Sequence, residues 1–301
     1  MTTHTQALQE LISQLPVELV RDIFEHSARD NMARNARWVG QNLALTSRTV
    51  YAWVALILFE SWNVRPAKLD DFYTLASASE KPCIVSHART LIIDRFAPAS
   101  VGRERTARWL FRPNFLAACT RLETVDVPPD VLAVLIRLPG FRPKIVHLTR
   151  CSLKDLHLTF DTIRPAFSRV KRIFMNEPAA LSIDGKDDFV YLFPEVTHII
   201  VRDYFDLVPS DRRCLDRLLD FPKLERLFVW LVWGKQLARR HRGIEILAAF
   251  NDTRVYHAYG LDIMHDAALQ KFSSDAGPSR VDRDGRDIWN LGNPVFSDDM
   301  D

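Results

Sequence analysis

A short apolar phrase recurs through the chain, and it constrains the fold more than any other feature of the sequence. The phrase is an apolar residue, two others, a second apolar residue, one other, and a third apolar residue. The four clearest copies are Leu122-Val125-Val127, Val170-Ile173-Met175, Val196-Ile199-Val201 and Leu224-Leu227-Val229. A phrase of this kind, repeated at a regular interval, predicts one short strand in each unit of a repeating structure.

Weaker copies of the phrase extend the pattern in both directions. They are Ala88-Leu91-Ile93, Ile145 with Leu148, and Thr253-Tyr256-Ala258. From Leu122 onward, successive copies begin 23, 25, 26, 28 and 29 residues apart, which is the period of a strand-plus-helix repeat. A phenylalanine stands three residues before four of the copies, at Phe167, Phe193, Phe221 and Phe250. We therefore expect an irregular α/β solenoid over residues 63–272.

The repeat hypothesis also predicts a register between strands. Ile173, Ile199 and Leu227 are each the middle residue of a copy, so we expect them at equivalent inward positions on adjacent parallel strands. The segments between copies, such as residues 130–138 and 211–219, have the apolar spacing of helices. The alternative is that the phrases are ordinary core strands of another kind of α/β domain.

Residues 13–62 have a helical pattern, after a mostly polar lead-in over residues 1–12. Pro16 suits a first helical position because its ring presets φ and its missing N–H needs no partner there. A polar, arginine-rich stretch separates this helix from a leucine segment, after which the hydroxyl of Thr46 or Ser47 can cap the next helix. Three short helices bury little apolar surface among themselves, so we expect part of that surface to be available to a partner.

The order of residues in this module resembles the F-box, in the version common in fungal F-box-like proteins. The matching residues are Leu15-Pro16-x-Glu18-Leu19-x-x-x-Ile23-Phe24, then Leu43-Ala44-Leu45-Thr46-Ser47-Arg48, and then Trp53. The resemblance implies docking onto the Skp-family adaptor of an SCF-type ubiquitin ligase, and through it onto cullin. It assigns adaptor contact to Leu15, Pro16, Leu19, Ile23 and Phe24, with Leu43, Leu45 and Trp53 packing the module or touching the adaptor. The chain departs from the commoner pattern in its polar stretch around residues 30–41.

The repeats resemble the degenerate leucine-rich repeats that often follow an F-box, where they recruit the protein to be ubiquitinated. The resemblance implies a substrate-recognition subunit that has no enzymatic activity and no cofactor. The alternative is a scaffold whose F-box-like head is merely structural. An adaptor-binding head should expose the apolar stripe over residues 15–24, whereas a structural head should bury that stripe against the first repeat.

Charge, cysteine usage and motif content narrow the function classes further. The net charge of +2, from 40 basic and 38 acidic side chains, provides no overall field that would attract nucleic acid or a membrane surface. The four cysteines form no CxxC pair, so we expect reduced thiols in the cytosol or nucleus. Phosphate-loop, nucleophile-elbow and HExxH motifs are absent from the sequence. We therefore expect neither catalysis nor a metal site.

The target site is predicted near the end of the repeats, where an apolar run over residues 229–233 precedes a basic stretch. Alternation along a strand places Trp230 on the face away from Leu227 and Val229. Tryptophan and arginine dominate interface energetics, so we expect an acidic target segment at Trp230, Lys235, Arg239, Arg240 and Arg242. A strand buried on both faces is the alternative. Residues 273–301, with seven aspartates and three arginines, are predicted to be a flexible acidic tail.

Overall fold

The chain forms two compact units, each with a hydrophobic core of its own. The computed structural model describes residues 15–64, 87–93, 113–148, 153–175, 189–203, 215–231, 247–259 and 293–294. The first unit, which we call the head, is Met1–Ser61, and the second, the body, is Trp62–Asp301.

The head consists of helical segments around a small core. Helix α2 spans Val17–Trp38, a π-helical turn spans Val39–Leu43, and α3 spans Arg48–Leu58. The side chain of Ser47 accepts a hydrogen bond from the Val50 N–H at 3.1 Å, which confirms the expected cap of α3. The core residues are Ala28, Val39, Leu43, Ala44, Val50, Val54 and Ile57.

The polar stretch around residues 30–41 is itself helical. Helix α2 continues into it as far as Asn35, where a φ of −156° and a ψ of 69° produce a kink. The Asn35 Oδ1 accepts a hydrogen bond from the Trp38 N–H at 3.0 Å, which is the geometry of a helix N-cap. Asn35 therefore ends one helical segment and begins the next, and no long loop separates the first helix from the leucine segment.

The body is built on one sheet, in which the described residues contribute nine strands in the order of the chain. The strands are β1 (Ser61–Val64), β2 (Thr90–Ile93), β3 (Thr124–Asp126), β4 (Ile145–Leu148), β5 (Arg172–Met175), β6 (His198–Asp203), β7 (Arg226–Leu231), β8 (Val255–Tyr259) and β9 (Asn293–Pro294). Neighbours from β2 to β8 pair in parallel, and β9 pairs antiparallel to β8, with Pro294 opposite Tyr256. The fold is therefore α/β with sequential parallel strands.

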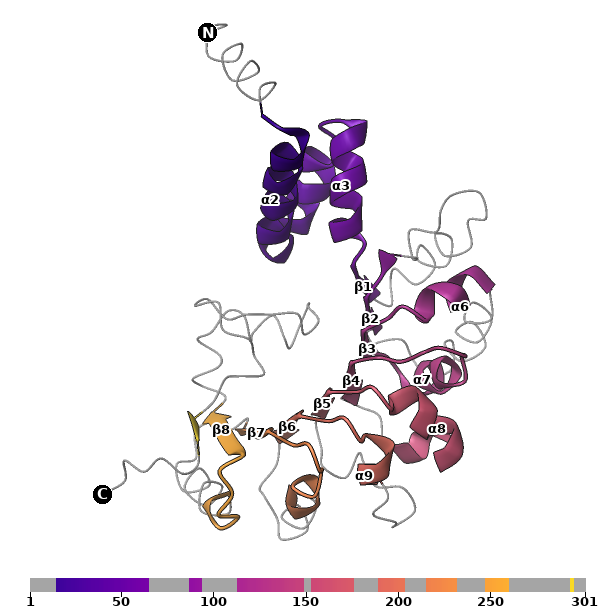
Figure 1. Ribbon diagram of the computed structural model, residues 1–301, viewed down its shortest axis with the longest axis vertical. Coiled ribbons are helices and arrows are strands. Elements are labelled where there is room, and N and C mark those ends of the chain that lie inside the picture. Colours follow the sequence, from indigo (N-terminus) through magenta and orange to yellow (C-terminus); the bar gives the residue numbers. More distant parts are fainter. Residues whose placement is uncertain are drawn as a thin grey trace, which may run out of the picture. The chain divides into compact units, whose positions relative to one another are not determined.

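The helices of the body lie along one side of the sheet, whose strands follow an arc with the helices on its outer side (Figure 1). They are α6 (Pro113–Cys119), α7 (Pro129–Ile136), α8 (Phe160–Phe167) and α9 (Phe189–Leu192), with a 3₁₀ turn at Leu153–Leu156. Helix α7 confirms the helix expected over residues 130–138. The core lies between these helices and the sheet, and we call the other side of the sheet its inner face.

The register confirms the predicted equivalence of the middle residues. Ile173 pairs with Ile199, and Ile199 pairs with Leu227, on adjacent parallel strands. The whole column of middle residues is Leu91, Val125, Val146, Ile173, Ile199, Leu227 and Val255, all buried. We call each strand together with the segment that connects it to the next strand a coil. Each coil places one apolar side chain at the same depth in the core.

In two of the weaker copies, the wrong residue was predicted at the middle position of the phrase, so the frame of each copy was wrong by one or two residues. Val146 occupies the middle position of its coil, so that Leu148 is the third apolar residue and not the second. Near the end, Val255 pairs with Leu227, whereas Tyr256 pairs with Phe228. In both places two large apolar residues stand side by side in the sequence, so the apolar pattern fits two frames and only the strand pairing selects one.

The recurring phenylalanine closes a turn before its strand. The carbonyl oxygens of Phe167, Phe193 and Phe221 accept hydrogen bonds from N–H groups three residues later, at 3.1, 3.3 and 3.2 Å. The three rings are fully buried, and those of Phe167 and Phe193 stack with centroids 4.9 Å apart. One residue type therefore serves both the turn and the core in successive coils.

We predict that Leu227→Ala destabilises the body by about 2–5 kcal/mol, because the change removes a fully buried side chain and leaves a cavity. Urea unfolding of the whole chain would measure the loss. The control is Tyr191→Ala, at a side chain that is 65% exposed, where the change should cost less than about 0.5 kcal/mol. Equal losses for both variants would contradict the solenoid core.

Candidate protein-docking surfaces

Large apolar side chains are exposed on the head. Leu15, Leu19 and Ile23 are 40%, 50% and 58% exposed, and Leu45 is 73% exposed. Leu19 and Ile23 are four residues apart on α2 and therefore share one face of the helix. The core of the head forms on a different side of α2, through Ala28 with the partly buried Phe24 and Met32. The head thus has an apolar surface in addition to its own core.

The other predicted adaptor residues divide between the core and the surface of the head. Leu43 is buried in the core, and Trp53 and Phe24 are partly buried with ring centroids 6.5 Å apart. Pro16 is exposed, and its carbonyl accepts a hydrogen bond from the Val20 N–H at 3.1 Å at the start of α2. Leu43, Phe24 and Trp53 therefore shape the head, while Leu15, Leu19, Ile23 and Leu45 are accessible to a partner.

Four more exposed apolar residues of the head were not predicted from the sequence. They are Val17, Trp38, Tyr51 and Leu56. Tyr51 and Leu56 lie on α3 between the core residues Val50, Val54 and Ile57, so the helical spacing of the core could have placed them outside. Trp38 follows the unforeseen cap at Asn35, and no sequence pattern indicated its position.

The inner face of the sheet contains a buried apolar and aromatic row next to a row of basic residues. The buried row, in strand register, is His147, Phe174, Ile200 and Phe228. The basic row is Arg172, His198, Arg226 and Arg254, all partly exposed. None of the four residues of the buried row belongs to the core cluster beneath the helices, as alternation along the strands requires.

Trp230 lies on the inner face, as alternation predicted, but its side chain is only 4% exposed. This burial agrees with the alternative of a strand buried on both faces at Trp230, and target binding at this residue stays a prediction. The other predicted target residues, Lys235, Arg239, Arg240 and Arg242, lie outside the described residues, as does most of the predicted acidic tail.

Several basic side chains of the inner face contact aromatic rings or a carboxylate of the same chain. The Cζ atom of Arg202 lies 4.9 Å from the Trp230 ring centroid, and that of Arg226 lies 3.6 Å from the Tyr256 ring centroid. Burial lowers the pKa of Arg226, although the guanidinium stays charged at neutral pH. Arg254 forms a bidentate ion pair with Asp252, in which Nη2 donates to Oδ2 at 2.6 Å and Nε donates to Oδ1 at 2.9 Å. These hydrogen bonds lower the pKa of Asp252.

His147 is a buried titratable group on the inner face. Its ring stacks on Phe174 with centroids 5.2 Å apart, and burial lowers its pKa to about 3. The Asp126 Oδ2 lies 3.6 Å from the His147 Nδ1, which would favour the charged ring, but the loss of solvation outweighs this attraction. His147 is therefore neutral at pH 7 and contributes to packing.

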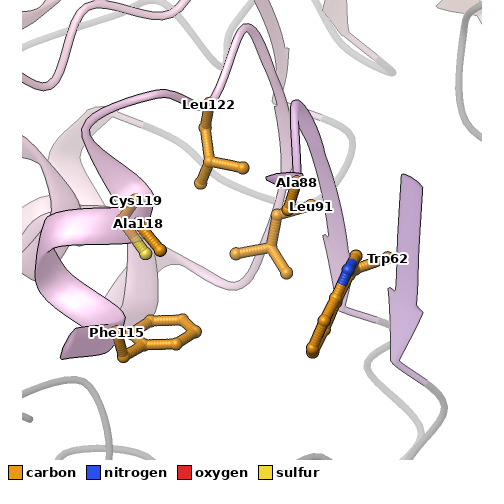
Figure 2. A pocket seen from close by; sticks show the side chains of 7 residues that line it. All are labelled: Trp62, Ala88, Leu91, Phe115, Ala118, Cys119 and Leu122. Carbon is orange, nitrogen blue, oxygen red and sulfur yellow. The ribbon is translucent and has the colours of Figure 1, made fainter. Parts of the chain in front are cut away.

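The described residues also contain a small apolar cavity of about 10 Å³ between the first coils (Figure 2). Trp62, Leu91, Phe115 and Leu122 line it, with Ala88, Ala118 and the thiol of Cys119. A space of this size holds one water molecule at most and has no polar group to bind it. Within the same described ranges, no cluster of three His, Cys, Asp or Glu side chains could hold a metal ion, and no helix could cross a membrane.

Two comparisons with known proteins identify no relative of this chain. No protein-family model matches the sequence, and a search of the curated proteins finds no match. The function is therefore inferred from the exposed surfaces of the head and the body.

We predict that His147 makes the body less stable in mild acid. His147 takes up a proton near pH 6.5 in the unfolded chain but only near pH 3 in the folded chain. The stabilisation of the folded chain that comes from this difference is therefore complete above pH 6.5 and decreases as the pH falls below it. Between pH 7.5 and pH 5 the loss should be about 2 kcal/mol. Urea unfolding at both pH values should show a smaller loss for His147→Leu than for the parent protein. The same change at the exposed His87 is the control, and an equal loss in His147→Leu and the parent would contradict the prediction.

Proposed function

We propose that the protein is the substrate-recognition subunit of an SCF-type ubiquitin ligase, in which the head binds a Skp-family adaptor and the body binds a target protein. The observation that carries this proposal is the exposure of Leu15, Leu19, Ile23 and Leu45 on a head that already has its own core. Large apolar side chains that remain exposed together on a small unit mark a protein interface.

The exposed apolar side chains of the head support adaptor binding. Within the head itself, half or more of Leu19 and of Ile23 is not covered by the core that the head forms. Each such side chain contributes about 1.5–3 kcal/mol when fully buried, so a few of them suffice for a stable complex. The sequence order of these residues, which resembles the F-box, agrees with the surface that they form.

The solenoid body supports the second half of the proposal. Its coils are joined by parallel backbone pairing, so residues distant in the sequence are presented on one continuous surface. A subunit that joins an adaptor and a target acts by raising the effective concentration of the target near the catalytic subunits. On this proposal the chain supplies proximity, and ubiquitin transfer is performed by other subunits.

We predict that Ile23→Asp reduces the affinity of the chain for a Skp-family adaptor by about 100-fold or more, because an unpaired carboxylate would be buried in an apolar contact. Isothermal titration of the full chain with the purified adaptor would measure the change. The head should stay folded, because Ile23 is 58% exposed in the free chain.

The matched control is Ile23→Leu, which keeps an apolar side chain of similar size at the same exposed site and should bind within about threefold of the parent protein. Circular dichroism would verify that both variants are folded. Undiminished adaptor binding by folded Ile23→Asp, or the absence of adaptor binding by the parent protein, would overturn the proposed function.

A further inference from the structure

We propose that the edge of the sheet where strands β2 to β5 begin is a docking site for an acidic peptide segment. We call this surface the basic edge, and its cations are Arg89, Arg121, Arg142, Lys144, Arg169 and Lys171. Each of them lies two or four residues before the middle residue of its coil. The recurring geometry of the solenoid therefore brings all six to one side of the sheet.

The backbone pairing extends to this edge and holds neighbouring coils in register there. The Lys144 carbonyl accepts a hydrogen bond from the Lys171 N–H at 2.8 Å, and the Glu123 carbonyl accepts one from the Lys144 N–H at 2.8 Å. The Glu123 carboxylate lies 3.0 Å from the Arg89 Nη1 and 3.1 Å from the Lys144 Nζ. One carboxylate is thus shared by two cations, and among the described residues at this edge the cations outnumber the carboxylates.

At the edge where the strands begin, the excess of basic residues is confined to the coils of β2 to β5. At the equivalent positions of β6 and β7 stand Glu195, Thr197, Lys223 and Glu225. The Lys223 Nζ lies 2.6 and 2.8 Å from the two Glu195 carboxylate oxygens, so this cation is neutralised by its neighbour. Because the whole chain has a net charge of only +2, the basic edge is a local feature and not a general property of the surface.

Repulsion between neighbouring cations of the basic edge raises the free energy of the unbound protein, and a bound anion would lower it. Lys144 and Lys171 are exposed at equivalent positions immediately before β4 and β5, and of the two only Lys144 has an ion-pair partner among the described residues, Glu123. Among the residues that the structure describes, no carboxylate lies within ion-pair distance of the Arg169 or Lys171 side chains. An acidic segment across the coils would relieve this repulsion.

The dimensions and chemistry of the edge fit a peptide better than a nucleic acid. The four coils span about 14 Å, at a spacing of about 4.8 Å between strands, which matches four or five extended residues. Proteins that bind single-stranded nucleic acid combine cations with exposed aromatic rings on which bases stack, but among the described residues the aromatic ones next to this edge, Phe141 and Phe167, are fully buried. The assignment of the acidic segment to a ubiquitination target rests on the proposed function, whereas the docking of the segment does not.

Fluorescence anisotropy with a labelled peptide of ten glutamates, added to the full-length chain, tests the site. We expect Lys144→Gln combined with Lys171→Gln to weaken binding by about tenfold, since each exposed charge pair contributes modestly. The matched control is Arg164→Gln combined with Lys223→Gln, which removes the same net charge at exposed positions outside the basic edge and should change binding less than about twofold. Raising the salt from about 50 to 300 mM should also weaken binding by the parent protein.

Three results would overturn the proposal. They are equal binding of a peptide of ten glutamines, equal weakening by the two double variants, and tighter binding of a ten-nucleotide thymidine oligomer than of the glutamate peptide. Because the assay contains no adaptor, its failure would leave adaptor docking by the head untouched. Conversely, loss of adaptor binding in Ile23→Asp should leave the peptide affinity unchanged, so the two proposals fail separately.

Discussion

The parallel backbone pairing between successive coils is the interaction on which the body depends. A coil contributes a strand of only three to six residues from β2 to β8, and its N–H and carbonyl groups are satisfied mainly by the strands on either side. The same pairing stacks the buried middle residues from Leu91 to Val255 into one column. Backbone pairing and side-chain packing are therefore coupled, and each coil is stable only between its neighbours.

The fold could be predicted from the sequence wherever local chemistry and periodicity agreed. The helix at α7 and the cap at Ser47 follow from patterns within a few residues. The α/β class and the alignment of Ile173, Ile199 and Leu227 follow from the regular recurrence of one short phrase. The frames at Val146 and Val255 could not be predicted, because apolar neighbours allow two registers and the choice is made by backbone bonds to another coil.

The candidate surfaces were predictable to different degrees for a related reason. Leu19 and Ile23 lie on one helix, so their spacing is visible in the sequence, and they were found in this way. The basic edge is different, because its six cations are distributed between positions 89 and 171 and meet only when the coils stack. The sequence left both an exposed and a buried Trp230 open, since alternation specifies the side of the strand and not what lies over it.

The direction of β9 has a consequence for self-association. A stack of parallel strands with a free edge can in principle be extended by a strand from a second molecule, which leads to fibres or aggregates. At the end of this sheet, the described part of β9 runs against β8 and places Pro294 at the outermost position. Proline has no N–H to donate, so an incoming strand meets an edge with a missing donor and a reversed direction. Among the described residues, the edge that β9 forms is therefore a poorer template for a further strand than the parallel edge of β8 would be.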